Sequence, residues 1–508
     1  MFKNLFRTKN LDVLIAQAQD SEKGLKKALG AFDLVLLGIG AIIGTGIFAT
    51  VGTAALGDSE RLGAGPALMI SFVITCVACA FTALCYAEFA AMVPISGSAY
   101  TYSYATLGEM IAWIIGWDLI IEYAVGNVAV AISWAGYFKE LLRGLGVDIP
   151  IWLSTNYTSV FVLPDPANQE KYQAALAFKQ QVLAAAPNIG GIPIIFNLPA
   201  VFIVLAITAI LVVGIKESVG FNTLMVVIKI IILLFFIFVG AFYIKPENWQ
   251  PFAPNGMSGI LAGASVIFFA YIGFDAVSTV AEETKNPKRD MPIGIIGSLI
   301  VCTIFYIVVA AVLTGMIPYQ KLAEGAAEPL AIALKYNGLN VAAGIVAFGA
   351  VVANTAVLLV FQLGQPRIFF SMGRDGLLPP VFSRIHPKFK TPHVTTILTG
   401  IAVAATAGVS SIEAMVDLTN IGTLFAFILV CVGIIILRVK DPNRERPFKV
   451  PFGIVIPVLG ILSCLLLIYY LPPTSIKRFI VWLAAGLIIY FLYGARHSTL
   501  NKENQSST

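Results

Sequence analysis

Charged side chains are scarce in this chain of 508 residues. Asp, Glu, Lys and Arg together make up 12% of it and hydrophobic residues 58%, whereas soluble domains carry roughly 25% charged residues. A chain with so little charge cannot cover a large water-exposed surface. The composition therefore excludes an ordinary soluble protein and predicts an all-α membrane protein that crosses the bilayer many times.

Histidine and cysteine are also rare. The three histidines lie in predicted loops or tails, so they cannot assemble a metal-ligand cluster, and we expect no metal and no cofactor. All six cysteines fall inside apolar segments, where a thiol behaves as a small apolar side chain, and we expect no structural disulfide. Residues 1–30 are polar and basic, which does not fit a cleaved signal peptide.

Twelve apolar runs are long enough to be candidate membrane spans, since a crossing helix needs about 20 residues. They cover residues 33–56, 66–92, 105–141, 197–214, 220–243, 257–281, 293–316, 329–372, 393–411, 414–437, 453–470 and 478–495. We predict an amphipathic cytoplasmic arm over 1–30, a five-helix repeat over 31–245 with a long external loop at 143–197, a second over 246–440, and helices 11 and 12 with a cytoplasmic tail over 441–508.

Lysine and arginine are unevenly distributed between the two sets of loops. Most of them fall on the side that carries both termini, which predicts that both termini are cytoplasmic and that the protein lies in the cell membrane. Topology thus accounts for the net charge of +5, and no nucleic-acid partner is needed to explain it.

The first span contains the run Gly38-Ile39-Gly40-Ala41-Ile42-Ile43-Gly44-Thr45-Gly46. Four glycines in one membrane helix predict an interruption around Gly40 to Gly46. Backbone freed from its helix at that depth is tolerated only where it lines a cavity. Freed N–H groups at the start of the second half-helix suit a carboxylate, and freed C=O groups at the end of the first suit an ammonium.

The sixth span repeats this theme. It reads Phe268-Phe269-Ala270-Tyr271-Ile272-Gly273-Phe274-Asp275, with a glycine close to an acid, five spans after the first interruption. Glycine alone is explained by close helix packing, but Asp275 is not. Interrupted helices at corresponding places in two five-helix halves indicate an inverted-repeat transporter with a binding site at mid-membrane depth.

Ionisable residues within the spans are the second signal. Lys229 lies about ten residues, or roughly 15 Å, from either end of the fifth span, too far to reach water. Asp118 and Glu122 share one helix face, which should point into the bundle. Two interpretations of Asn354 account for its position almost equally well: a side chain that lines a cavity, and a side chain that forms a hydrogen bond to another helix. Asp417, near the external end of its span, fits an outer gate and a solvated helix cap equally well.

These motifs resemble the amino acid–polyamine–organocation superfamily, and within it the cationic amino acid transporters and their bacterial relatives. The resemblance runs from about Ala31 to Arg438. It is carried by the segments Gly40 to Phe48, Tyr86-Ala87-Glu88, Pro94 to Tyr102, Gly116-Trp117-Asp118, Phe269 to Asp275, Glu282 to Pro292 and Gly373 to Leu378. It implies a LeuT-type fold of five plus five helices with discontinuous helices 1 and 6.

The resemblance also implies site residues. The substrate carboxylate would meet the N–H groups of Gly44, Thr45 and Gly46, and its amine the carbonyls of Ile42, Phe269, Ala270 and Ile272. Phe269 and Tyr271 would lie near an aromatic lid. Lys229 matches the fifth-helix lysine of proton-coupled relatives, so H⁺ is the expected coupling ion, with Glu122 and Asp275 setting its working range.

The expected function is Na⁺-independent transport of a broad range of amino acids, small neutral ones such as alanine or cationic ones. A cation-selective exchanger or uniporter and a non-transporting amino-acid sensor are the alternatives; no nucleophile and base pair suggests an enzyme. Residues 143–197 contain no cysteine, so we expect no disulfide-linked subunit. The last two spans carry no interior charge, which leaves room for a small non-covalent membrane partner.

Overall fold

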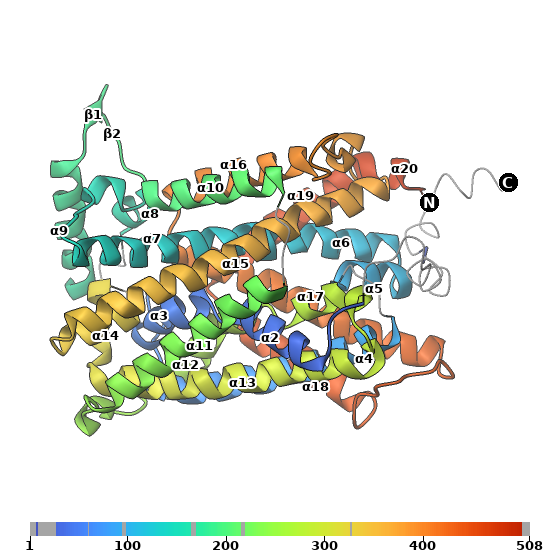
Figure 1. The fold of residues 1–508 in the computed structure, drawn as a ribbon, viewed down its shortest axis with the longest axis horizontal. Coiled ribbons are helices and arrows are strands. Elements are labelled where there is room, and N and C mark those ends of the chain that lie inside the picture. Colours follow the sequence, from blue (N-terminus) through green and yellow to red (C-terminus); the bar gives the residue numbers. More distant parts are fainter. Residues whose placement is uncertain are drawn as a thin grey trace.

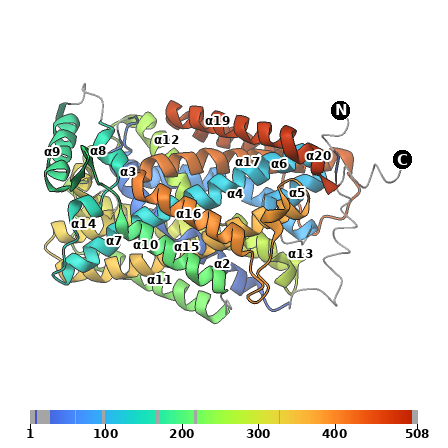
Figure 2. The ribbon, with the colours of Figure 1, turned by 90° about the horizontal axis from the view of Figure 1, so that it is seen from above.

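The computed structural model describes residues 7–8, 27–58, 60–93, 98–163, 169–214, 219–325 and 328–499. The predicted amphipathic arm lies almost wholly outside these residues. The described chain is a bundle of long helices whose axes run roughly parallel (Figure 1). Its two described termini, Arg7 and Thr499, lie at one end of the bundle, where Arg7 and Ser498 both contact Glu109. Seen from above, α19 (Pro473–Ile489) lies along one edge of the bundle (Figure 2).

The helices follow the apolar runs closely. Among the described residues, eight helical segments are long and apolar enough to cross a membrane, or nine if one bent pair is counted as a span. The eight are Gly65–Met92, Glu109–Gly144, Thr223–Ala241, Gly256–Ala281, Pro287–Met316, Asn340–Arg374, Ile412–Lys440 and Pro473–His497. The bent pair joins Ala31–Ile42 to Gly46–Leu56. The chain is therefore a multi-pass membrane protein.

Three further apolar helices are shorter: α10 (Leu198–Val213), α16 (His393–Val409) and α18 (Val455–Tyr469). At 1.5 Å per residue, α10 is about 24 Å long. It lies beside α16 at the edge of the bundle (Figure 1). These three coincide with predicted spans 197–214, 393–411 and 453–470.

The remaining labelled elements, given in chain order, complete the bundle. They are α2 (Ala31–Ile42), α3 (Val51–Leu56), α4 (Leu68–Met92), α5 (Ser98–Thr106), α6 (Glu109–Ile120), α7 (Gly126–Gly144), α8 (Tyr157–Phe161), α9 (Gln169–Ala185), β1 (Asn188–Ile189), β2 (Ile192–Pro193), α11 (Val219–Ala241), α12 (Gly256–Ile267), α13 (Pro287–Met316), α14 (Pro329–Tyr336), α15 (Asn340–Arg374), α17 (Ile412–Lys440), α19 (Pro473–Ile489) and α20 (Ala495–His497). Helix α13 packs on α2 and α4, and α15 packs on α7.

One predicted span is wrong in its extent. The run 329–372 is two helices, α14 and α15, because Gly338 has a φ of 77° and ends the first of them. Glycine takes this left-handed conformation without the steric cost that a side chain brings, which is why it commonly follows the last residue of a helix. The crossing helix therefore starts at Asn340.

Candidate functional site

The first interruption separates α2 from a π-helix over Gly46–Thr50 that continues into α3. Ile43 is extended, with φ −74° and ψ 105°, and the two halves are bent by 42°. The break at Ile43 to Thr45 falls within the predicted interval. The first N–H groups of a helix have no partner inside it, so the amides at the start of the second half-helix find none within that helix.

The second interruption lies in the middle of the sixth span. Helix α12 passes into a 3₁₀ turn over Phe268–Tyr271, Ile272 is extended with φ −60° and ψ 132°, and Gly273 has a φ of 121°. A second 3₁₀ segment, Asp275–Glu283, follows. The predicted interruption of this helix is therefore present.

The two interruptions touch one another through glycine. A Cβ placed on Gly46 would lie 2.2 Å from Ala270 Cα, and one on Gly273 would lie 2.9 Å from the carbonyl of Ala41. Side chains at these positions would separate the two helices. The glycines predicted from sequence to break the helix therefore also permit main chain to meet main chain.

Tyr306 of α13 bridges the two interruptions. Its hydroxyl lies 3.0 Å from the Ile42 carbonyl oxygen and 2.9 Å from that of Ala270, two of the four carbonyls expected to receive the substrate amine. Each carbonyl oxygen has a second lone pair for another donor. The sequence reading missed Tyr306; a tyrosine in the middle of an apolar span was the available signal.

Lys229 ties the fifth span to the first. Its side chain is fully buried, and Nζ donates a 2.6 Å hydrogen bond to the Gly40 carbonyl oxygen, one turn before the break. Among the described residues, no hydrogen bond or ion pair joins this Nζ to Glu122 or Asp275. The structure thus brings Lys229 to the first helix, as expected, but not to the two carboxylates.

The carboxylates form a separate buried cluster. Glu122 lies in a π-helical turn over Ile121–Val125, and its neighbours are Asp275, Asp118 and Thr423. Asp275 Oδ1 accepts a 3.3 Å hydrogen bond from the Gly273 amide, so the cluster contacts the second interruption directly. Neither oxygen of Asp118 has a hydrogen-bond partner among the described residues.

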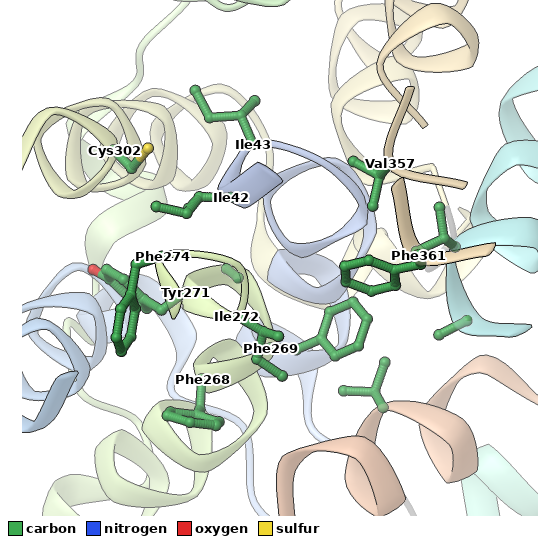
Figure 3. Close-up of a cluster of buried hydrophobic side chains, with 14 of the residues drawn as sticks. Ile42, Ile43, Phe268, Phe269, Tyr271, Ile272, Phe274, Cys302, Val357 and Phe361 are labelled. Atoms are coloured by element: carbon green, nitrogen blue, oxygen red, sulfur yellow. The ribbon is translucent and has the colours of Figure 1, made fainter. Parts of the chain in front are cut away.

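A polar chain runs from the first interruption into the bundle. The Thr45 hydroxyl donates to Asn354 Oδ1 at 3.1 Å, and Asn354 Nδ2 donates to Ser133 Oγ at 3.0 Å. Asn354 is therefore an interhelical link and also a neighbour of the site. Figure 3 shows apolar side chains around the two interruptions, with Phe269 directed toward Phe361 of α15.

Tyr271 lies on the other side of the second interruption. Figure 3 shows it pointing away from Phe361, and its hydroxyl donates a 3.0 Å hydrogen bond to the Phe72 carbonyl oxygen. Of the two predicted lid residues, Phe269 faces the space beside α15 and Tyr271 braces the interruption against α4. The structure does not bring the two rings together.

Buried ion pairs lie toward both ends of the bundle. At the end away from the termini, Arg61 contacts Asp417 at 2.6 Å and Asp58 at 2.6 Å, and the Arg61 and Asp417 side chains are nearly inaccessible to water. Burial alone would lower the pKa of Arg61, but the two carboxylates raise it above its ordinary value. Asp417 is thus a buried ion-pair partner and not a solvated cap.

At the end that carries the termini, Glu88 of α4 is the centre of a second cluster. It pairs with Arg438 of α17, lies 3.4 Å from Arg446 Nε, and accepts a 2.7 Å hydrogen bond from the Val450 amide. Arg61, at the opposite end, lines a small cavity. Its lining includes Thr50, Thr53 and Glu413.

Two interrupted membrane helices in contact with one another, in a bundle of long apolar helices, are typical of a membrane permease. The model of the amino acid permease family matches residues 29–493, and the chain belongs to that family. A branched-chain amino acid permease, BcaP, of Bacillus subtilis (strain 168) is 49% identical over 500 residues, covering 98% of this chain and 99% of the relative.

Other relatives show how varied the substrates in this family are. A methylthioribose transporter of the same bacterium is 47% identical over 499 residues, covering 98% of this chain and all of the relative. The vacuolar cationic amino acid transporter 4 of Arabidopsis thaliana is 36% identical over 446 residues, 87% of this chain and 68% of the relative. The resemblance to cationic amino acid transporters is confirmed, and the relatives are transporters, not enzymes.

Proposed function

We propose that this protein is a secondary active transporter that couples the uptake of a neutral amino acid to H⁺ and works by alternating access. The observation that carries the proposal is the pair of interruptions in contact. One offers N–H groups at Gly44, Thr45 and Gly46, and the other offers carbonyls at Phe269, Ala270 and Ile272. Together they complement the two charged ends of a zwitterion.

The proposed substrate range follows from the surroundings of the site. Phe269, Phe361 and Val357 lie beside the interruptions (Figure 3), and apolar surfaces like these suit an aliphatic side chain. A guanidinium or ammonium side chain needs an acid, and we assign Glu122 and Asp275 to carrying protons. We infer a range of small and branched neutral amino acids, in line with the printed name of the Bacillus relative.

The proposed coupling rests on Lys229. While it carries a proton, its ammonium donates to Gly40 and holds the first helix against α11. Loss of the proton leaves a weaker, neutral donor, so the arrangement in which the two helices are tied becomes less populated. Glu122 and Asp275 would carry protons at the other interruption. The coupling ion is thus H⁺, and no further cofactor is required.

The proposed topology completes the picture. The nine long spans together with α10, α16 and α18 make twelve crossings, divided into repeats over residues 31–245 and 246–440. Both termini lie in the cytoplasm of a cell whose plasma membrane holds the protein. The Arg61–Asp417 pair then closes the external side and the Glu88–Arg438 pair the cytoplasmic side, and transport requires each to open in turn.

Uptake into proteoliposomes tests this function. Purified protein is reconstituted and supplied with labelled alanine, isoleucine, leucine, arginine or lysine, each with and without an inwardly directed pH gradient. We expect accumulation of the neutral amino acids only with the gradient. Equal uptake at zero gradient that requires internal amino acid would instead indicate exchange, and accumulation of arginine alone would contradict the neutral range.

A further inference from the structure

A two-stranded hairpin stands at the end of the molecule opposite to the termini. Strands β1 and β2 pair so that Ile189 faces Ile192 across a turn of two glycines. Gly190 and Gly191 have φ angles of 62° and 87°, as a tight two-residue hairpin turn demands. Both isoleucines at this tip are 69% exposed.

The base of the hairpin is firmly held. The Ile194 amide donates to the Pro187 carbonyl oxygen at 2.9 Å, and the Phe196 amide donates to that of Trp152 at 3.0 Å. Ile195 is buried in a small apolar core with Val160 and Val182. The direction of the tip is therefore fixed by folded structure on both strands.

The tip projects sideways from the bundle. Figure 1 shows β1 and β2 extending past the layer formed by α10 and α16, across the direction of the helix axes. Helix α10 starts only five residues after β2 and exposes Leu198, Phe202 and Leu205 along the same edge. The first turn of a helix that crosses the bilayer lies near the boundary between lipid and water, because helix length matches the thickness of the bilayer core.

Charge is absent from the hairpin and from α10. The sequence from Val182 to Gly214 contains no Asp, Glu, Lys or Arg. Helix α9, which precedes the hairpin, does carry charge: Lys179 lies over the ring of Phe161, 5.0 Å from its centroid. The hairpin is thus uncharged like α10, the lipid-facing helix that follows it. It differs in this respect from α9, the helix that precedes it.

We propose that the hairpin is an interfacial anchor that inserts Ile189 and Ile192 into the boundary between headgroups and acyl chains of the leaflet opposite to the termini. Apolar side chains gain by leaving water at that boundary, whereas charged side chains lose. An anchor on the rim of one repeat would hold that part of the bundle at a constant depth in the bilayer while other helices move.

Site-specific fluorescence tests the anchor. Ile189→Cys and Ile192→Cys are labelled with an environment-sensitive nitrobenzoxadiazole reagent and reconstituted into nanodiscs with and without doxyl-labelled phosphatidylcholine. The matched control is Gln181→Cys on the exposed side of α9, and the unsubstituted protein gives the background from the native cysteines. We expect blue-shifted emission at 189 and 192 and quenching at least three-fold stronger than at 181.

Two outcomes would overturn the anchor. Emission at 189 and 192 that matches the water-exposed control in both kinds of nanodisc would place the tip in solvent. Emission that shifts only when two copies share one nanodisc would place a second copy on the tip. As a final check, Ile192→Asp in the Ile189→Cys background should remove most of the quenching, and a variant that keeps it would also contradict insertion. Because both side chains are exposed, these substitutions should leave the bundle folded.

Discussion

Replacement of Lys229 by methionine should abolish proton-driven accumulation while leaving amino-acid binding in place. The two side chains have similar length, so the buried site stays filled, but the donor to the Gly40 carbonyl oxygen is lost. That bond measures 2.6 Å, and Lys229 is fully buried. Methionine also holds no proton, so the variant cannot exchange one during transport.

The magnitude follows from the one contact removed. A hydrogen bond to a charged group contributes about 1.5–3 kcal/mol, which corresponds to about a 10- to 150-fold change in the equilibrium between two arrangements. In the wild-type protein, one proton per amino acid and a gradient of one pH unit support roughly tenfold accumulation. The variant should only equilibrate its substrate across the membrane.

The assay is uptake of labelled isoleucine or alanine into proteoliposomes with internal pH one unit above external pH, together with equilibrium binding in detergent. Lys245→Met is the matched control, because this lysine lies beyond the end of α11 and is exposed. Control protein should accumulate substrate like the wild type. Undiminished accumulation by Lys229→Met under the same gradient would refute the role given to Lys229.

Three further substitutions probe the rest of the site. Gly46→Ala should reduce uptake at least tenfold, because its Cβ would lie 2.2 Å from Ala270 Cα and forcing the helices apart costs about 1–3 kcal/mol. Tyr306→Phe should raise the substrate concentration at half-maximal uptake by up to about tenfold. The variant loses a hydroxyl bridge that contributes about 0.5–1.5 kcal/mol. Asp417→Asn should lower the midpoint of thermal unfolding in detergent, because removing one partner of a buried pair costs about 3–5 kcal/mol and leaves Arg61 with a single carboxylate.

Each of these has a matched control in the same chain. Gly344→Ala adds a Cβ where nothing lies within 4 Å, and it should transport normally. Tyr469→Phe alters a hydroxyl on a side chain that is 77% exposed, and Asp148→Asn alters a carboxylate that is 79% exposed. If a site variant and its control give the same result, the role assigned to that residue's contact is contradicted.

The positions of the helix interruptions were predictable because they depend on local chemistry. Glycines within an apolar run weaken a helix wherever the run is placed, so Gly44 and Gly273 could be read directly. The ends of most helices were predictable for a similar reason, since apolar length limits them. The division of the run 329–372 was missed, because a glycine near a helix end resembles a glycine used for packing until its φ angle is seen.

Which groups share a site was decided by the tertiary structure. The family resemblance groups Lys229, Glu122 and Asp275 for proton coupling, but only helix packing directs the lysine to Gly40 and gathers the carboxylates at the other interruption. Tyr306 was invisible as a bridge for the same reason. The sequence by itself determined that this chain is a membrane protein with two interrupted helices. Apolar runs and glycines affect membrane insertion and helix continuity through the local sequence alone. The pairing of side chains across helices depends on rotation and register, which no local pattern contains.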